Sequence, residues 1–174
     1  MKPEKIGQRD IYQGKILNVR IDRVREDGIE YDREIVAHNG SAVVVPVFED
    51  GTVALVRQYR HAAGEYLLEI PAGSLEKGED PKLGAARELE EEIGVVADSI
   101  EKLAEFYVSP GFLSELMHVF VATGLTEVGQ KLEYDELLTV ERYSFDSLLK
   151  MIRNREIRDA KTICGVLFAS ERFR

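Results

Sequence analysis

A run of acidic residues between residues 73 and 95 constrains this chain of 174 residues more than any other feature. Glu88, Glu91 and Glu92 are spaced i, i+3 and i+4, so on a helix they share one face. Their like charges repel, and no basic residue follows to relieve the repulsion. A solvated surface, the usual interpretation of a glutamate-rich helix, therefore fits poorly. A hard divalent cation such as Mg²⁺, which binds carboxylate and phosphate oxygens, would remove the repulsion.

The flanking residues predict the helix that carries these glutamates. Asp80 is a candidate N-cap and Pro81 suits the first helical position. Gly94 is well placed to end the helix in a left-handed cap. The guanidinium of Arg87 is expected to pair with Glu79 and to hold the preceding loop against the helix. The apolar stripe that predicts a buried helix face consists of Leu83, Ala86, Leu89 and Ile93.

Length and composition predict one globular domain spanning residues 1–174. The net charge of −9 argues against a protein that follows a nucleic-acid backbone, because such proteins present basic patches to the phosphates. A nucleotide is still compatible with this charge, since its phosphates would approach through a bound metal and local arginines. We therefore expect a small-molecule substrate and no nucleic-acid partner.

No segment of the sequence resembles a signal peptide, and no apolar run approaches the ~18 residues of a membrane span. A cytoplasmic protein without a membrane partner is therefore expected. The single cysteine, Cys164, excludes an intrachain disulfide and is expected to be a buried structural thiol.

Hydrophobic periodicity predicts alternating strands and helices. Two early strands, residues 16–25 and 29–36, are joined by a turn at Asp27-Gly28. Two apolar runs, residues 41–48 and 52–59, are expected to be central strands paired with each other. Later strands are expected at residues 100–107, 117–122 and 137–145, and helices at residues 147–154 and from Asp159 or Ala160 to Ser170.

The acidic run resembles the Nudix box, the signature of hydrolases that act on nucleoside diphosphates linked to another group. Its defining positions are Gly73, Glu79, Arg87-Glu88-Leu89, Glu91-Glu92 and Gly94-Val95. The resemblance implies an α/β/α sandwich with a mixed central sheet and additional N-terminal antiparallel strands. It also implies that Glu88 and Glu92 bind Mg²⁺ or Mn²⁺, with Glu91 close by and the backbone carbonyl of Ala72 as a further ligand.

Sequence outside this box is similar to the ADP-ribose pyrophosphatase branch of the same family. Pro110 and Gly111 lie in a loop that begins fifteen residues after Gly94, as the proline-containing loop of that branch does. Three other segments, residues 33–36, 55–60 and 68–73, carry the same resemblance. The implied reaction is attack of water on a phosphorus of ADP-ribose, which yields AMP and ribose 5-phosphate.

Several residues are candidates for substrate contact. Arg57 and Arg60 stand at the end of a predicted central strand, where forked donors can meet diphosphate oxygens. The resemblance assigns Arg33 and Glu34 to the adenine side, together with the loop of Pro110 and Gly111. It also suggests Glu115 for the ribose or for a place near the metals.

The reaction requires a general base within reach of the attacking water. Family members of this type take a glutamate from a mobile loop that precedes a late strand, here residues 127–136. Glu136 directly precedes the strand and matches that position best, and Glu133 is second. Glu91 is a third candidate, as the ligand of a second metal or of a water.

The resemblance further implies a homodimer in which residues 1–38 supply strands that pack on the partner and complete the adenine pocket. Two alternatives stay open. One is a Nudix hydrolase for another nucleoside diphosphate derivative. The other is a module that binds ADP-ribose without cleaving it, although such a sensor is expected to have lost box carboxylates, and none is missing here.

Overall fold

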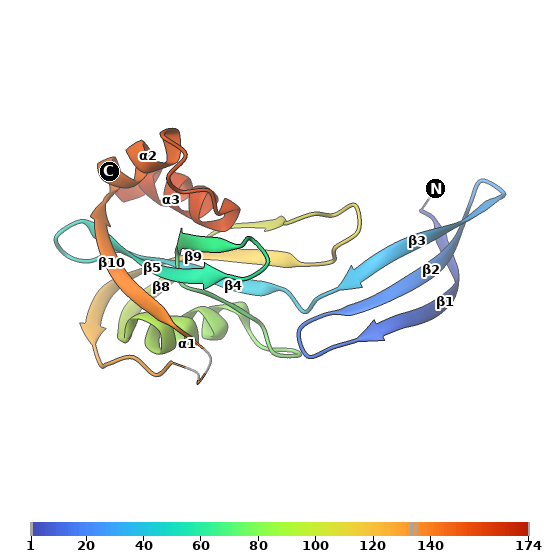
Figure 1. The fold of residues 1–174 in the computed structure, drawn as a ribbon, viewed down its shortest axis with the longest axis horizontal. Coiled ribbons are helices and arrows are strands. Elements are labelled where there is room, and N and C mark those ends of the chain that lie inside the picture. The colour runs from blue at the N-terminus through green and yellow to red at the C-terminus, as the bar shows by residue number, and fades with distance from the viewer. Residues whose placement is uncertain (1, 133, 135, 174) are drawn as a thin grey trace. The chain divides into compact units, whose positions relative to one another are not determined.

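The computed structural model describes residues 2–132, 134 and 136–173. These residues form three β-sheets and three helices (Figure 1). The chain divides into two compact units, one of residues 1–40 with 106–117 and one of residues 41–105 with 118–174. In chain order the elements are β1 (Glu4–Gln13), β2 (Asn18–Glu26), β3 (Ile29–Ala37), β4 (Ser41–Pro46), β5 (Thr52–Arg60), β6 (Glu65–Glu69), β7 (Ala72–Ser74), α1 (Pro81–Ile93), β8 (Val95–Tyr107), β9 (Leu116–Glu127), β10 (Leu138–Ser144), α2 (Phe145–Arg153) and α3 (Ala160–Phe173).

The first unit contains the antiparallel sheet β1-β2-β3. Asp27 and Gly28 join β2 to β3 with φ angles of 49° and 81°, the positive values that a tight two-residue hairpin requires. This hairpin confirms the predicted turn. Strand β1 was not predicted, because its sequence is polar and lacks the alternation of apolar residues that marks a half-buried strand.

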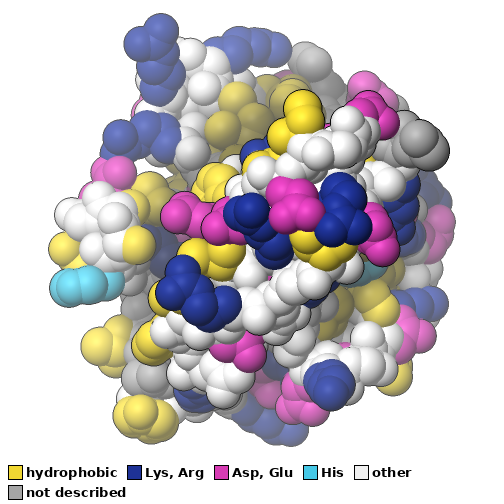
Figure 2. Space-filling view, turned by 90° about the vertical axis from the view of Figure 1, so that its right-hand side faces the viewer, with side chains coloured by type: hydrophobic (Ala, Val, Ile, Leu, Met, Phe, Trp, Pro, Cys, Tyr) yellow, Lys and Arg dark blue, Asp and Glu magenta, His cyan; other side chains and the backbone are white. Residues whose placement is uncertain are grey.

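Ion pairs connect neighbouring strands of this sheet. Arg23 pairs with Asp32 at 3.0 Å, and Arg25 pairs with Glu30 at 2.7 Å across β2 and β3. Basic and acidic side chains also alternate on the molecular surface in Figure 2. Opposite charges on facing strands stabilise strand pairing, each pair by roughly 0.2–1 kcal/mol. Lys5 of β1 likewise pairs with Asp22 of β2 at 2.8 Å, so ion pairs support both of the polar strands in this sheet.

The second unit has three layers. Helix α1 lies on one side of the strands, and α2 and α3 lie on the other side (Figure 1). The strands form two sheets, β10-β5-β6 and β7-β4-β9-β8. The α/β/α layering implied by the family resemblance is confirmed, with the middle layer split into two sheets. The apolar core beneath α1 includes Ala42, Val44, Ala54, Val56, Ala85, Leu89, Ile93 and Phe120.

The predicted pairing of β4 with β5 is wrong. Both strands are central, but each lies in a different sheet: β4 between β7 and β9, and β5 between β10 and β6. In the described residues, the two segments meet only next to the turn, through the isolated bridge between Val47 and Val53 and the Phe48 N–H, which donates to the Thr52 carbonyl at 2.9 Å. β4 ends at Pro46, and the Val47 N–H still donates to the Ala122 carbonyl of β9 at 2.9 Å before the chain turns into β5.

The C-terminal helices follow the sequence pattern closely. Helix α2 begins at Phe145, two residues earlier than predicted, because the hydroxyl of Ser144 accepts the Ser147 N–H and acts as the N-cap. Helix α3 packs against β4 and β6. Within the described part of the chain, no helix is long and apolar enough to cross a membrane.

Candidate active site

Both ends of helix α1 match the sequence prediction, but its two predicted faces do not: Leu83 of the apolar stripe is 65% exposed, whereas Glu88 and Glu92 are buried together with Leu89 and Ile93. The side chain of Asp80 accepts the Lys82 N–H over 2.8 Å, and Pro81 is the first helical residue. Gly94 adopts the left-handed conformation with φ 69° and donates its N–H to the Leu89 carbonyl. The two caps therefore define where the helix begins and ends, and so they place Glu88 and Glu92 in its last two turns.

Glu88 and Glu92 are unusual because they are charged residues in the interior. Their exposed fractions are 5% and 3%. The segment that forms β7 covers them: the Ala72 N–H donates to Glu92 Oε2 over 3.0 Å. A Cβ on residue 73 would lie 1.7 Å from Glu88 Oε1, so the backbone comes this close only because residue 73 is glycine.

Burial disfavours the charge on both glutamates. It raises the pKa of Glu88 to about 7, against the opposing charge of Arg87, and the pKa of Glu92 to about 8, with a further contribution from the charge of Glu88. The carboxylate of Glu136 also raises the pKa of both residues. Glu136, the first-ranked base candidate, therefore lies within electrostatic reach of Glu88 and Glu92.

Arg87 does more than the sequence predicted. Its Nε is 3.3 Å from Glu79 Oε1, so the predicted pair is present. Its Nη1 also donates to Glu88 Oε1 at 2.7 Å and to Glu91 Oε2 at 2.9 Å. The repulsion on the acidic face is thus partly relieved by a cation that precedes the glutamates in sequence, a contact that the sequence prediction, based on the residues that follow, did not include.

The donor chemistry of the site fits a hard divalent cation. Two buried carboxylates with raised pKa values lack the full compensation that buried charges require. Among the described residues, no three Asp, Glu, His or Cys side chains are grouped as a coordination shell. The cation that contacts Glu88 and Glu91 in this structure is the Arg87 guanidinium. Arg87 contacts only Oε1 of Glu88, so the second carboxylate oxygen is the one that a cation could take without displacing the guanidinium.

The acidic loop after β9 is anchored on the C-terminal end of α1. The Gly94 carbonyl accepts the N–H groups of Val128 at 2.8 Å and Gly129 at 3.1 Å. The Gln130 side-chain amide donates to the Glu92 carbonyl at 2.6 Å, and the Lys131 N–H donates to the Glu91 carbonyl at 3.0 Å. These contacts were not predicted, because no sequence pattern marks a pairing between a loop and a distant helix end. Glu133, the second base candidate, lies outside the described residues.

Arg57 and Arg60, the predicted diphosphate contacts, both have carboxylate partners. Arg60 forms two parallel hydrogen bonds with Glu69, at 2.7 and 2.6 Å, and Arg57 pairs with Glu141. Glu69 is only 1% exposed and also pairs with Lys161 of α3. Sequence reasoning missed Glu69, although a glutamate within the apolar run 67–70 was the available signal.

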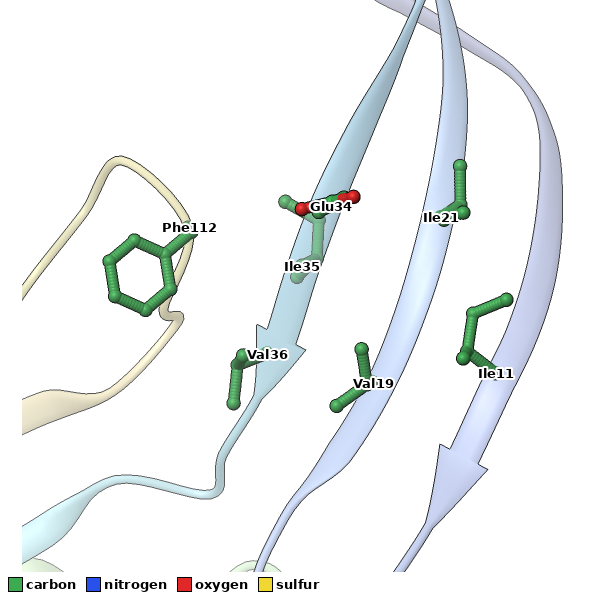
Figure 3. Close-up of a pocket in the computed structure, with 7 residues that line it drawn as sticks. All are labelled: Ile11, Val19, Ile21, Glu34, Ile35, Val36 and Phe112. Atoms are coloured by element: carbon green, nitrogen blue, oxygen red, sulfur yellow. The ribbon is translucent and has the colours of Figure 1, made fainter.

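The candidates for the adenine side and the ribose lie in the first unit. There, the loop of residues 109–114 is hydrogen-bonded to the edge of β3. The Val36 N–H donates to the Phe112 carbonyl at 2.7 Å, and the Ser114 N–H donates to the Val36 carbonyl at 3.0 Å. The loop that contains Pro110 and Gly111 is thereby held next to the strand of Arg33 and Glu34. The mainly apolar pocket of about 330 Å³ that results is lined by Ile11, Val19, Ile21, Glu34, Ile35, Val36 and Phe112 (Figure 3).

Arg33 and Glu115 are not among the residues that line this pocket. The guanidinium of Arg33 lies over the Tyr31 ring, 4.3 Å from its centroid. The carboxylate of Glu115 is 3.9 Å from Nδ1 of His38. Of the two residues predicted for the adenine side, Glu34 therefore lines the pocket. Arg33 does not, and its guanidinium packs on the Tyr31 ring instead.

Comparison with known proteins agrees with this architecture. The NUDIX domain profile matches residues 38–164, so the chain belongs to the Nudix family. The chain is 37% identical over 171 residues to the ADP-ribose pyrophosphatase of Bacillus subtilis (strain 168), covering 97% of this chain and 92% of that protein. It is 38% identical to the ADP-ribose pyrophosphatase of Mycobacterium tuberculosis, covering 94% of this chain and 81% of that protein. A crystal structure of an ADP compounds hydrolase superposes with a TM-score of 0.87 at 21% identity, covering 98% of this chain and 94% of the other.

Proposed function

We propose that the protein hydrolyses the diphosphate of ADP-ribose, or of a related ADP-sugar, to AMP and ribose 5-phosphate with the help of Mg²⁺. The observation that carries the proposal is the burial of Glu88 and Glu92 on one helix turn, beneath a backbone segment that touches both. Membership of the Nudix family and the names of the two bacterial relatives support the choice of substrate.

Glu88 and Glu92 are proposed to hold the divalent cation, with the Ala72 carbonyl and Glu91 as further ligands. Mg²⁺ is the expected ion and Mn²⁺ an acceptable substitute, because both take carboxylate oxygens. A cation bound there would neutralise charge on the diphosphate and lower the pKa of the attacking water. The pairing of Arg87 with Glu79 keeps the loop before α1 in place while these ligands act.

Glu136 is proposed as the general base that takes the proton of the attacking water. Its electrostatic influence on both Glu88 and Glu92 supports this role, because a base must lie close to the site that activates the water. Glu133 and Glu91 are the alternatives. Arg60, which also influences Glu92, is proposed to contact the diphosphate with donor groups beyond those that bind Glu69, and Arg57 to assist from the same strand.

The adenosine side is proposed to bind at the pocket of the first unit. Phe112 and the isoleucines offer an apolar wall, and Glu34 offers hydrogen-bond acceptors for an exocyclic amine. Arg33, Pro110, Gly111 and Glu115 are proposed to shape or border this region.

A homodimer is proposed to form through the N-terminal strands. Ile11, Tyr12 and Ile16, at or near the end of β1 that leads into β2, are all more than half exposed and offer an apolar surface for a partner. Light scattering at micromolar concentration that returns only the monomer mass would contradict the dimer. A single catalytic domain over residues 1–174 and a cytoplasmic location stay predictions of the sequence.

The substrate assignment is tested with a panel of ADP-ribose, other ADP-sugars, NADH and GDP-sugars, assayed with Mg²⁺ in ¹⁸O-labelled water. We expect the highest kcat/KM for ADP-ribose or another ADP-sugar, with AMP as a product. The label will appear in AMP if water attacks the adenosine-linked phosphorus, and in ribose 5-phosphate if it attacks the other. A kcat/KM at least about 10-fold higher for NADH or a GDP-sugar than for every ADP-sugar would overturn the assignment.

A further inference from the structure

The first turn of α3 is linked to the active-site backbone through a completely buried threonine. Thr162 has an exposed fraction of 0%. Its hydroxyl donates to Asp159 Oδ2 over 2.5 Å and accepts the Ile70 N–H over 2.9 Å. Asp159 also accepts the Thr162 N–H at 2.9 Å, so it fixes both the helix start and the direction of the hydroxyl.

This link lies two residues before the predicted ligand segment. Ile70 is followed by Pro71, whose carbonyl accepts the Val44 N–H at 3.0 Å, and then by Ala72, whose N–H binds Glu92. Proline fixes its own φ angle and restricts the residue before it. With Ile70 held at its N–H and Pro71 held at its carbonyl, little rotational freedom is left in the backbone that meets Glu92.

Two further contacts bring α3 to the same segment. Lys161 pairs with Glu69, the residue before Ile70. Gly165 allows a close approach, because a Cβ at this position would lie 2.6 Å from Ile70 Cδ1. The helix thus contacts Glu69 and Ile70 through three successive features, of which Thr162 is the one that binds the backbone directly.

We propose that Thr162 is a positioning residue for the metal site: its hydroxyl holds the Ile70 backbone so that the segment of Ala72 and Gly73 stays in register with Glu92 and Glu88. The inference rests on the proposed role of these glutamates as metal ligands. Residues that orient ligands from outside the coordination shell typically change metal affinity or activity by 10- to 100-fold when they are replaced. Thr162 is therefore expected to act on metal affinity and not only on stability.

The test compares Mn²⁺ binding by calorimetry in the wild type, Thr162→Val and Thr162→Ser. Valine keeps the shape of threonine but cannot accept the Ile70 N–H, so we expect Mn²⁺ affinity to fall by about 10-fold or more. Serine keeps the hydroxyl, and we expect it to restore most of the affinity. Affinity in Thr162→Val within about 2-fold of wild type would overturn the positioning role.

Val166→Ala supplies the control for a purely structural effect. Val166 is a fully buried residue of the same helix. Its truncation is expected to lower Tm by several degrees without changing Mn²⁺ affinity. An equal loss of affinity in this variant would assign the effect to general loosening of α3, which also overturns the proposal.

Glu92→Gln in the same titration separates the inference from the function on which it rests. Loss of Mn²⁺ binding in Glu92→Gln, with wild-type affinity in Thr162→Val, would overturn the role of Thr162 alone. Wild-type affinity in Glu92→Gln would instead overturn the metal site, and the proposed role of Thr162 with it.

Discussion

Gly73 and Glu88 are packed so closely that only hydrogen fits between the backbone of one and the carboxylate of the other: a Cβ on residue 73 would lie 1.7 Å from Glu88 Oε1. Gly73→Ala must therefore displace the glutamate or the strand. We expect about a 10- to 100-fold loss of metal-dependent turnover, because Glu88 would leave the position in which it can share an ion with Glu92.

Steady-state kinetics at saturating Mg²⁺ will check this effect. The matched control is Gly7→Ala on β1, where the added Cβ would meet Arg23 Cβ at 3.5 Å, an ordinary contact. Wild-type turnover in Gly73→Ala would show that the contact with Glu88 has no catalytic importance.

Gly94→Ala tests whether the contacts of residues 128–131 with the end of α1 are needed for catalysis. The added Cβ would lie 2.6 Å from the Gln130 backbone nitrogen, and residue 94 has a left-handed φ of 69°. Backbone strain alone should cost roughly 1–2 kcal/mol of unfolding free energy. Displacement of the loop should also lower kcat, because Glu136 belongs to the same loop.

Gly78→Ala separates the two effects, measured by denaturant unfolding and by kcat. Residue 78 has a similar φ of 82°, but a Cβ there would meet nothing within 4 Å. We expect a loss of stability from strain in both variants and a loss of kcat in Gly94→Ala only. A kcat that is unchanged in Gly94→Ala would argue against the anchoring of the loop as a catalytic requirement.

Glu136→Gln should slow hydrolysis while leaving KM close to the wild-type value, because a general base acts in the transition state. The expected fall in kcat is about 10²- to 10⁴-fold. Glu127→Gln, an exposed position at the end of β9, is the control and should keep the wild-type rate. If Glu136→Gln turns over normally, the base must be sought at Glu133 or Glu91.

The stability of the metal-free protein should depend on pH through Glu92. Burial raises its pKa from 4.5 to about 8, so the folded state binds the proton more tightly than the unfolded state. The folded state therefore loses stability as the pH rises from about 4.5 towards about 8. Glu92→Gln, which is always neutral, should escape this loss.

Thermal unfolding in the presence of a chelator will measure this pH-dependent loss of stability. The Tm advantage of Glu92→Gln over wild type should grow between about pH 5 and about pH 8. A gap between Glu92→Gln and wild type that does not change with pH would be inconsistent with a buried carboxylate that titrates in this range.

The parts of the fold that could be predicted from sequence are those set by local chemistry. Asp80, Pro81 and Gly94 mark the ends of α1 because caps depend on one residue and its nearest neighbours. The hairpin at Asp27-Gly28 was predictable for the same reason. The polar β1 and the three-residue β7 were missed, because one has no apolar face and the other is too short to show a period.

The parts of the site that were missed depend on contacts between distant segments. The bond of Thr162 to Ile70 spans 92 positions, and the bond of Gln130 to Glu92 spans 38. In neither case does the local sequence around one residue indicate which distant residue it will contact. The separation of β4 and β5 into two sheets is a similar case, since two buried strands joined by a short turn look like a hairpin in sequence.

The most direct test of the central claim is the Mg²⁺ dependence of AMP release from ADP-ribose by the wild type and by Glu92→Gln, with circular dichroism to establish that both are folded. We expect wild-type turnover to require the cation, and the variant to be slower by about 10²-fold or more even at saturating Mg²⁺. Near-normal turnover by Glu92→Gln at saturating Mg²⁺ would contradict the assignment of the buried glutamates as the ligands on which hydrolysis depends.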